Sequence, residues 1–479
     1  MTSLIKKQAV RGVIWSAIER FSVQGIQFIL SILIARFVLP SEYGLIAMLS
    51  IFLAIAQTFV DSGFSNALIQ KKDRTEEDFS TVFYFNIVIA LVIYGLFYVF
   101  APSIASFYEE PKLTSVSRWI GLSLIINGLS IVQRSKLTIA LNFKIQAKAS
   151  LIAVFLSGIV GVYLAYMGYG VWALVFQSLI NSFINAILLW LFANWIPGWC
   201  FSWNSFRSLF SFGSKLLLSG LMHTVYTNLY SLVIGKKYSA MDVGLYNRAN
   251  HFALFPSSNI VSVITRAIYP VQCQIQDDDK KLNASFIQYL RMTCLLVFPL
   301  MMMIVALSDP LVHFLLTDKW SSSAELLSIL AFAYMWCPIM MINNQILNVK
   351  GRSDYFLKAE IAKKVMAFLI LFATLPFGVE ILCWGVVLYN FVDMAIIIFF
   401  VKRVIRTSYM EQIRNIFPLF LISLLMGMAV YICVYYLSCC LFLKLVIGVV
   451  LSGFIYLILC VLFRVYEILN LFDYFRSRL

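Results

Sequence analysis

Charged side chains interrupt three apolar runs of this sequence. Glu19 and Arg20 stand side by side in SAIERFSVQGIQF, Lys215 lies in SFGSKLLLSGL, and Arg266 lies in VSVITRAIY. A charged side chain at the centre of a bilayer costs about 2.5 to 3.5 kcal/mol on insertion scales, so such residues usually face a bundle interior or a water-filled cavity. Arginine holds an oxyanion with two parallel hydrogen bonds, and lysine acts as a point charge. We therefore predict that Arg20, Lys215 and Arg266 line a hydrated cavity that attracts an anion.

A structural explanation of these cations is also open. Arg20 would pair with Glu19 or extend to the membrane interface, and Arg266 would be one more anchor on its side of the membrane. A fourth cation, Arg248 in LYNRANHF, is expected toward the opposite mouth of the cavity. There it would contact a leaving solute or anchor the start of a helix.

Two acids are candidates for ion coupling. Asp393 in YNFVDMAII lies thirteen residues after Glu380 and nine before Lys402, which makes it the most central acid of any apolar run. A carboxylate at that depth must be protonated, paired with a cation or bound to an ion, and a change between these states is what ion coupling requires. The alternative is a neutral acid that forms a packing hydrogen bond. Asp61 in FVDSGF is the second candidate, and it would otherwise shape the end of its helix.

The elements that position these residues are membrane-spanning helices. The chain has 479 residues, of which 61% are hydrophobic and 13% charged, and its mean hydropathy is +0.88. A hydrocarbon core about 30 Å thick needs about 20 helical residues to cross it, and apolar runs of that length recur throughout. We predict an all-α polytopic membrane protein with about fourteen spans: 13–38, 44–66, 80–106, 114–133, 147–167, 170–193, 207–235, 241–271, 286–307, 323–348, 357–376, 380–401, 416–437 and 443–463.

The net charge of +14 reflects topology rather than nucleic-acid binding. With the amino terminus placed in the cytoplasm, 26 of the 37 Lys and Arg residues fall on that side, eight on the opposite side and three inside predicted spans. The positive-inside rule then puts both termini in the cytoplasm, which requires an even number of crossings. Arg20, Lys215 and Arg266 all fall in the cytoplasmic half of the membrane.

Motifs for catalysis, metals or cofactors are not expected. The nine cysteines lie mostly inside predicted spans and lack the paired spacing typical of zinc sites, and the three histidines are scattered. The sequence contains no glycine-rich phosphate loop. We therefore predict no catalytic residues, no metal and no cofactor.

A repeat relates two parts of the chain. Ile34–Leu45 (IARFVLPSEYGL) and Ile234–Leu245 (IGKKYSAMDVGL) align without a gap, with identical Ile, Gly and Leu residues and matching basic and acidic positions. Each segment links the first and second spans of its half on the external side, so the repeat is parallel with a pseudo-twofold axis along the membrane normal. We predict a six-helix half at 1–193, a linker at 194–208, a six-helix half at 209–403, and two additional helices with a cytoplasmic tail at 404–479. Parallel repeats of this kind commonly place a substrate site between the halves and alternate its access.

Several segments resemble a known family in order and spacing. ARFVLPSEYGLIAM, FVDSGFSNALIQKKDRTEEDFSTVFYFN, GYGVWALVFQSLI, FGSKLLLSGL, VGLYNRANHFALFP and ITRAIYPVQCQIQDD are similar to the Wzx-like polysaccharide transporters of the MOP superfamily, over about Arg11 to Arg403. The resemblance implies a bacterial inner-membrane protein that flips or exports undecaprenyl-pyrophosphate-linked oligosaccharide for O-antigen, capsule or exopolysaccharide assembly. The cations would then receive the pyrophosphate, and the partners would be the lipid-linked oligosaccharide, membrane lipids and a coupling cation, H⁺ or Na⁺.

One departure from the family affects the expected ion coupling. The seventh span of such proteins often reads NLDNLLIG, whereas this chain reads NLYSLVIG and has Tyr230 where the acid is expected. Asp393 is then the best remaining coupling residue. Two other functions stay open: a small-molecule, cation-coupled exporter of the same superfamily, and a membrane polysaccharide polymerase or ligase. The short outer links, such as Met167–Gly170, count against the enzyme.

Overall fold

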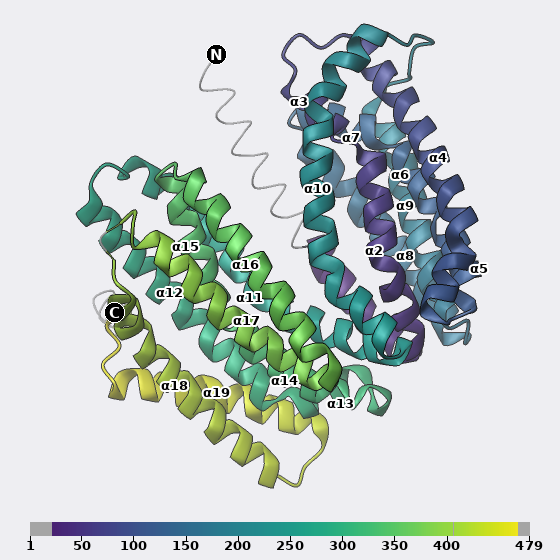
Figure 1. The fold of residues 1–479 in the computed structure, drawn as a ribbon. Helices are drawn as coiled ribbons and strands as arrows, with labels where there is room; N and C mark the ends of the chain where they lie inside the picture. Colours follow the sequence, from purple (N-terminus) through teal and green to yellow (C-terminus); the bar gives the residue numbers. More distant parts are fainter. Residues whose placement is uncertain (1–21, 406, 468–479) are drawn as a thin grey trace. The chain divides into compact units, whose positions relative to one another are not determined.

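The computed structural model describes residues 22–405 and 407–467, and every regular element in those ranges is a helix (Figure 1). Ten helical segments of the described chain are long and apolar enough to cross a membrane. The predicted class, an all-α polytopic membrane protein, is confirmed. By contacts, the chain divides into two compact units, Met1–Gly244 and Leu245–Leu479. This division follows packing and does not test the division into repeats.

The helices of the first unit are α2 (Pro40–Asp61), α3 (Phe64–Gln70), α4 (Glu76–Tyr108), α5 (Lys112–Ile120), α6 (Leu122–Gly128), α7 (Ile131–Ile139), α8 (Phe143–Tyr166), α9 (Val171–Ala193) and α10 (Trp203–Lys237). A helix at Ser22–Ala35 precedes them. The second unit contains nearly all of α11 (Ala240–Gln274), then α12 (Asp279–Ala306), α13 (Ser308–Leu316), α14 (Ser323–Tyr334), α15 (Cys337–Val349), α16 (Ser353–Thr374), α17 (Val379–Val401), α18 (Tyr409–Tyr436) and α19 (Leu441–Leu462). Short 3₁₀ turns lie at Asp318–Trp320 and Leu375–Phe377.

Four of the predicted spans form helices that fall outside the ten apolar segments. They are the helix Ser22–Ala35, α10, α11 and α16. The first is too short within the described residues to be counted, whereas the other three carry charged side chains such as Lys215, Arg266 and Lys363. Charged side chains are tolerated at buried or cavity-facing positions but are costly where they face lipid. We therefore expect these helices to line a polar pathway.

The fourth predicted span of each half is interrupted. Span 114–133 is built from α5, α6 and α7, and span 323–348 is built from α14 and α15. The second break falls immediately before Pro338, which occupies the first turn of α15 because proline lacks the N–H that a helix interior needs. Both breaks fall at the same position in the predicted order of spans.

The repeated glycines mark a reciprocal close contact. A Cβ atom on Gly44 would overlap the carbonyl oxygen of Ala240, and a Cβ atom on Gly244 would overlap the carbonyl oxygen of Pro40. The four residues occupy the first turns of α2 and α11. Glycine is required at both positions because only a residue without Cβ lets the two backbones approach this closely.

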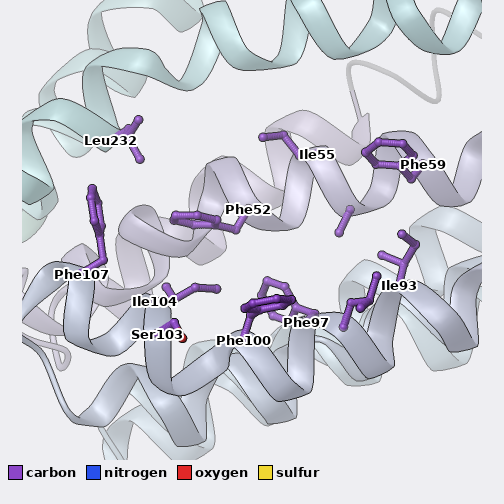
Figure 2. Close-up of a pocket in the computed structure, with 12 residues that line it drawn as sticks. Phe52, Ile55, Phe59, Ile93, Phe97, Phe100, Ser103, Ile104, Phe107 and Leu232 are labelled. Carbon is purple, nitrogen blue, oxygen red and sulfur yellow. The ribbon is translucent and has the colours of Figure 1, made fainter.

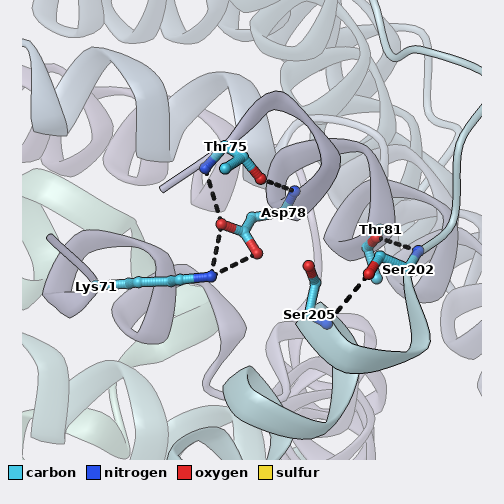
Figure 3. Close-up of polar contacts among 6 residues, drawn as sticks. All are labelled: Lys71, Thr75, Asp78, Thr81, Ser202 and Ser205. Carbon is cyan, nitrogen blue, oxygen red and sulfur yellow. Dashed lines mark hydrogen bonds and ion pairs between the residues drawn. The ribbon is translucent and has the colours of Figure 1, made fainter. Parts of the chain in front are cut away.

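The predicted linker is attached to the beginning of α4 (Figure 3). Lys71 lies 2.7 Å from both carboxylate oxygens of Asp78, and Asp78 accepts a hydrogen bond from the backbone N–H of Thr75 at 2.8 Å. One turn further along α4, the hydroxyl of Thr81 accepts the backbone N–H of Ser202 at 2.9 Å. Ser202 is the N-cap of α10, so the start of α10 is tied directly to the start of α4.

The two carboxy-terminal helices pack within the second unit. Tyr456 of α19 donates a hydrogen bond to the carbonyl of Leu295 in α12 at 2.8 Å. Arg291 of α12 donates to both carboxylate oxygens of Glu467, at 2.5 and 3.0 Å. Although burial raises the pKa of the Glu467 carboxyl, the hydrogen bonds from Arg291 hold it below its usual range. The segment that follows α19 is therefore fixed to α12 by a charged pair.

Candidate functional site

The predicted cavity cations lie on different helices. Arg20 and its neighbour Glu19 lie outside the described residues. Lys215 is exposed on α10 in the first unit, and Arg266 is exposed on α11 in the second. Each of these two exposed cations remains a candidate contact for an anion.

Arg248 is the buried member of the predicted set. Its side chain lies in the second unit with its guanidinium carbon 5.4 Å from the centre of the Trp320 ring and 6.0 Å from that of Phe252. Arg248 and Arg266 are eighteen residues apart, which is five helical turns and about 27 Å along α11. The two cations therefore share a face of one helix but cannot hold the same phosphate.

Asp61, the last residue of α2, belongs to a short series of hydrogen-bonded side chains. Gln57 donates a hydrogen bond to Asp61 at 3.0 Å, and Asn127 of α6 donates to Gln57 at 3.1 Å. Asp61 itself is exposed. It is therefore accessible at the end of its helix, while its neighbour Gln57 connects α2 to α6.

Asp393 belongs to a buried charge cluster. Its carboxylate lies 3.2 Å from the ammonium of Lys363, which also lies 2.8 Å from Glu360 and 3.3 Å from the side-chain oxygen of Asn344. The Lys363 residue is only 2% exposed. The three helices α15, α16 and α17 thus meet around one ammonium group, and a second cation, Lys364, lies 3.8 Å from Glu360.

The sequence pointed to Asp393 but missed its partner. The topology count placed Lys363 among the cytoplasmic-side cations, whereas the structure buries it ten residues into α16. The available signal was the spacing of Glu360, Lys363 and Lys364, since residues three and four apart share one face of a helix. Of the three states expected for the Asp393 carboxylate, the one observed is pairing with a cation.

A second feature, an apolar groove, runs along the first unit (Figure 2). It encloses about 600 Å³ and is lined by residues of α2, α4 and α10: Phe52, Ile55, Ala56, Phe59, Ile93, Leu96, Phe97, Phe100, Ser103, Ile104, Phe107 and Leu232. On α4 the lining extends over fourteen residue steps from Ile93 to Phe107, which is about 21 Å. Ala56, Phe97 and Ile104 are buried at its floor, and Leu96 and Phe100 are exposed at its rim.

Comparison with solved structures identifies the fold. The structure matches the lipid II flippase MurJ in its inward closed conformation with a TM-score of 0.78, covering 94% of this chain and 99% of that chain at 16% sequence identity. The chain therefore has the same fold as that protein, which agrees with the fold implied by the resemblance found in the sequence.

Comparison with protein families is more specific. Residues 33–325 match the family described as polysaccharide biosynthesis protein, so the chain belongs to that family. It is 26% identical to the teichuronic acid biosynthesis protein TuaB of Bacillus subtilis (strain 168), over 89% of each chain. It is 23% identical to the lipopolysaccharide biosynthesis protein WzxC of Escherichia coli (strain K12), over 88% of this chain and 86% of the relative.

Proposed function

We propose that this protein flips or exports undecaprenyl-pyrophosphate-linked oligosaccharide across the bacterial inner membrane by alternating access, for O-antigen, capsule or exopolysaccharide assembly. The names of TuaB and WzxC, which refer to teichuronic acid and lipopolysaccharide biosynthesis, support this class of cargo. The protein acts as a transporter rather than an enzyme, and both of its termini lie in the cytoplasm.

The apolar groove is the observation that carries the proposal. A lipid-linked cargo needs a place for its hydrocarbon tail, whereas a soluble small molecule does not. The groove extends over about two-thirds of a hydrocarbon core about 30 Å thick. Its rim side chains are exposed, so a chain can enter from the bilayer.

The polar end of the cargo is assigned to the exposed cations. Lys215 lies on α10, the helix that also supplies Leu232 to the groove. It precedes Thr224, which contacts Thr58 of α2 at 3.2 Å, by nine residues or about 14 Å of helix. A pyrophosphate held by Lys215 would leave its tail free to follow the groove toward the other side of the membrane. Arg20 and Arg266 are proposed as further contacts for the anion.

Ion coupling is assigned to Asp393, with Asp61 as a secondary candidate. The buried ammonium of Lys363 neutralises Asp393 in the described conformation. If the Asp393 carboxylate were protonated or bound another cation, its ion pair with Lys363 would break. The Lys363 ammonium would then pair with Glu360 alone, and the contacts among α15, α16 and α17 would change. Such a two-state element is what coupling to a proton or sodium gradient requires.

Filling the groove tests the proposal. Ser103→Trp places an indole within the lining, so the tail loses its seat, and we expect flipping of lipid-linked oligosaccharide in proteoliposomes to fall at least tenfold. Ser106→Trp is the matched control, because Ser106 is exposed on the same helix but does not line the groove. Equal flipping by the two variants at equal abundance would contradict the role of the groove.

A further inference from the structure

A separate pocket lies where α4 meets α5 in the first unit. It encloses about 520 Å³ and is lined by Tyr94, Tyr98, Pro111, Thr114, Ser115, Arg118, Trp119 and Leu122. Unlike the apolar groove, it combines one guanidinium with four side-chain hydroxyls. Its chemistry is therefore suited to an anion with several oxygen atoms.

Arg118 has unused hydrogen-bonding capacity. Its guanidinium carbon lies 4.2 Å from the centre of the Tyr98 ring, and its Nε is buried without an acceptor. Among the residues that the structure describes, no carboxylate forms an ion pair with Arg118. The nearby acid Glu109 lies 3.5 Å from Lys236 instead. A guanidinium without a carboxylate partner favours an anionic acceptor supplied from outside the chain.

The position of the pocket corresponds to the membrane interface. The lining includes Pro111 in the link between α4 and α5, and Thr114 and Ser115 in the first turn of α5. Trp119 is 47% exposed and Tyr98 is 43% exposed. Trp119 also contacts Trp172 and Phe176, with ring centres 6.4 and 5.9 Å apart. Exposed tryptophan and tyrosine side chains are typical of the headgroup layer.

We propose that this pocket binds the phosphate of an anionic membrane lipid. Arg118 holds the phosphate oxygens through its terminal guanidinium N–H groups, and Thr114 provides a hydroxyl donor beside it. The acyl chains lie along the apolar surface of α4. This site is distinct from the proposed transport pathway, so it does not depend on the identity of the transported lipid.

Lipid binding tests the proposal. Purified protein, stripped of lipid by detergent, is titrated with phosphatidylglycerol or phosphatidylcholine and analysed by native mass spectrometry. We expect preferential retention of phosphatidylglycerol, and we expect Arg118→Gln to weaken its binding about tenfold, which corresponds to about 1.4 kcal/mol. Lys112→Gln is the matched control, since it removes the same charge from the same helix at an exposed residue outside the lining.

The outcomes separate the possible sources of phosphate. Loss of bound phosphatidylglycerol on addition of millimolar inorganic phosphate would show that the pocket recognises phosphate without the lipid chains, and would contradict the lipid assignment. Equal retention of the two lipids, or equal losses in Arg118→Gln and Lys112→Gln, would overturn the site. If Arg118→Gln does not fold, Thr114→Val removes a hydroxyl from the pocket at constant volume and is expected to weaken phosphatidylglycerol binding in the same direction.

Discussion

Substitution of Lys363 by methionine is the most direct test of the buried charge cluster. Methionine keeps much of the apolar stem but removes the ammonium, so the carboxylate of Asp393 loses the cation 3.2 Å away. At an effective dielectric constant of about 20, two unit charges at that distance attract each other by about 5 kcal/mol. Removing one partner of a buried pair typically destabilises a protein by about 3 to 5 kcal/mol. We expect Lys363→Met to lower the free energy of unfolding by that amount.

A double-variant cycle distinguishes pairing from simple packing. Lys363→Met combined with Asp393→Asn should be less destabilised than the sum of the two single changes, because no uncompensated charge remains. Free energies of unfolding are measured in detergent by titration with sodium dodecyl sulfate and circular dichroism. The exposed pair Arg352–Asp354, 2.8 Å apart, is the control, and Arg352→Met should leave the free energy of unfolding nearly unchanged. Additive effects at Lys363 and Asp393 would refute the pairing.

The same variants test coupling in vesicles. Asp393→Asn keeps the side-chain size but cannot carry the charge that a proton or sodium ion neutralises. We expect it to insert normally and to lose the dependence of transport on a proton or sodium gradient. Unchanged gradient dependence would remove Asp393 from the coupling mechanism and leave it a packing residue.

Two further predictions concern the fold and the topology. Gly44→Ala should destabilise the protein by about 1 to 3 kcal/mol or more, because its Cβ would overlap the backbone of Ala240. Thermal unfolding in detergent measures the effect. The control Gly95→Ala has open space around the added Cβ and should not destabilise, so equal effects would contradict the contact. In a cysteine-free background, Asp73→Cys should resist an impermeant thiol reagent added from outside, whereas Tyr169→Cys should react. Both residues are exposed in their links, so the predicted side of the membrane decides the result. Labelling of Asp73→Cys from outside would overturn the topology.

The helices and their class could be read from the sequence because a span of about 20 apolar residues is a local signal. The interruptions were harder to see: α5, α6 and α7 together still form one apolar stretch, so hydropathy gives no indication of the breaks. The charge of Arg118 was visible, but its buried and unsatisfied Nε depends on how α5 packs against α4.

The candidate sites show the same limit. Asp393 could be predicted from its depth alone, since an acid in the middle of a span needs a partner or a proton. Its pairing with Lys363 joins residues thirty positions apart on two helices, and no local spacing specifies that contact. The groove could not be predicted either, because its lining comes from three helices, α2, α4 and α10, whose packing no local pattern specifies.

The contact between the two repeated glycines has the form of an isologous interface. In a twofold homodimer, residue i of one subunit meets residue j of the other, and j meets i. Here position 44 meets 240 and position 244 meets 40 in the same way, within a single covalent chain. The two glycines therefore share one steric constraint, and a methyl group at either position would push apart the same crossing of α2 and α11. The other residues of the two repeats have largely diverged. Replacing one glycine would not remove the steric constraint on the other, because both lie at the same crossing of the two helices.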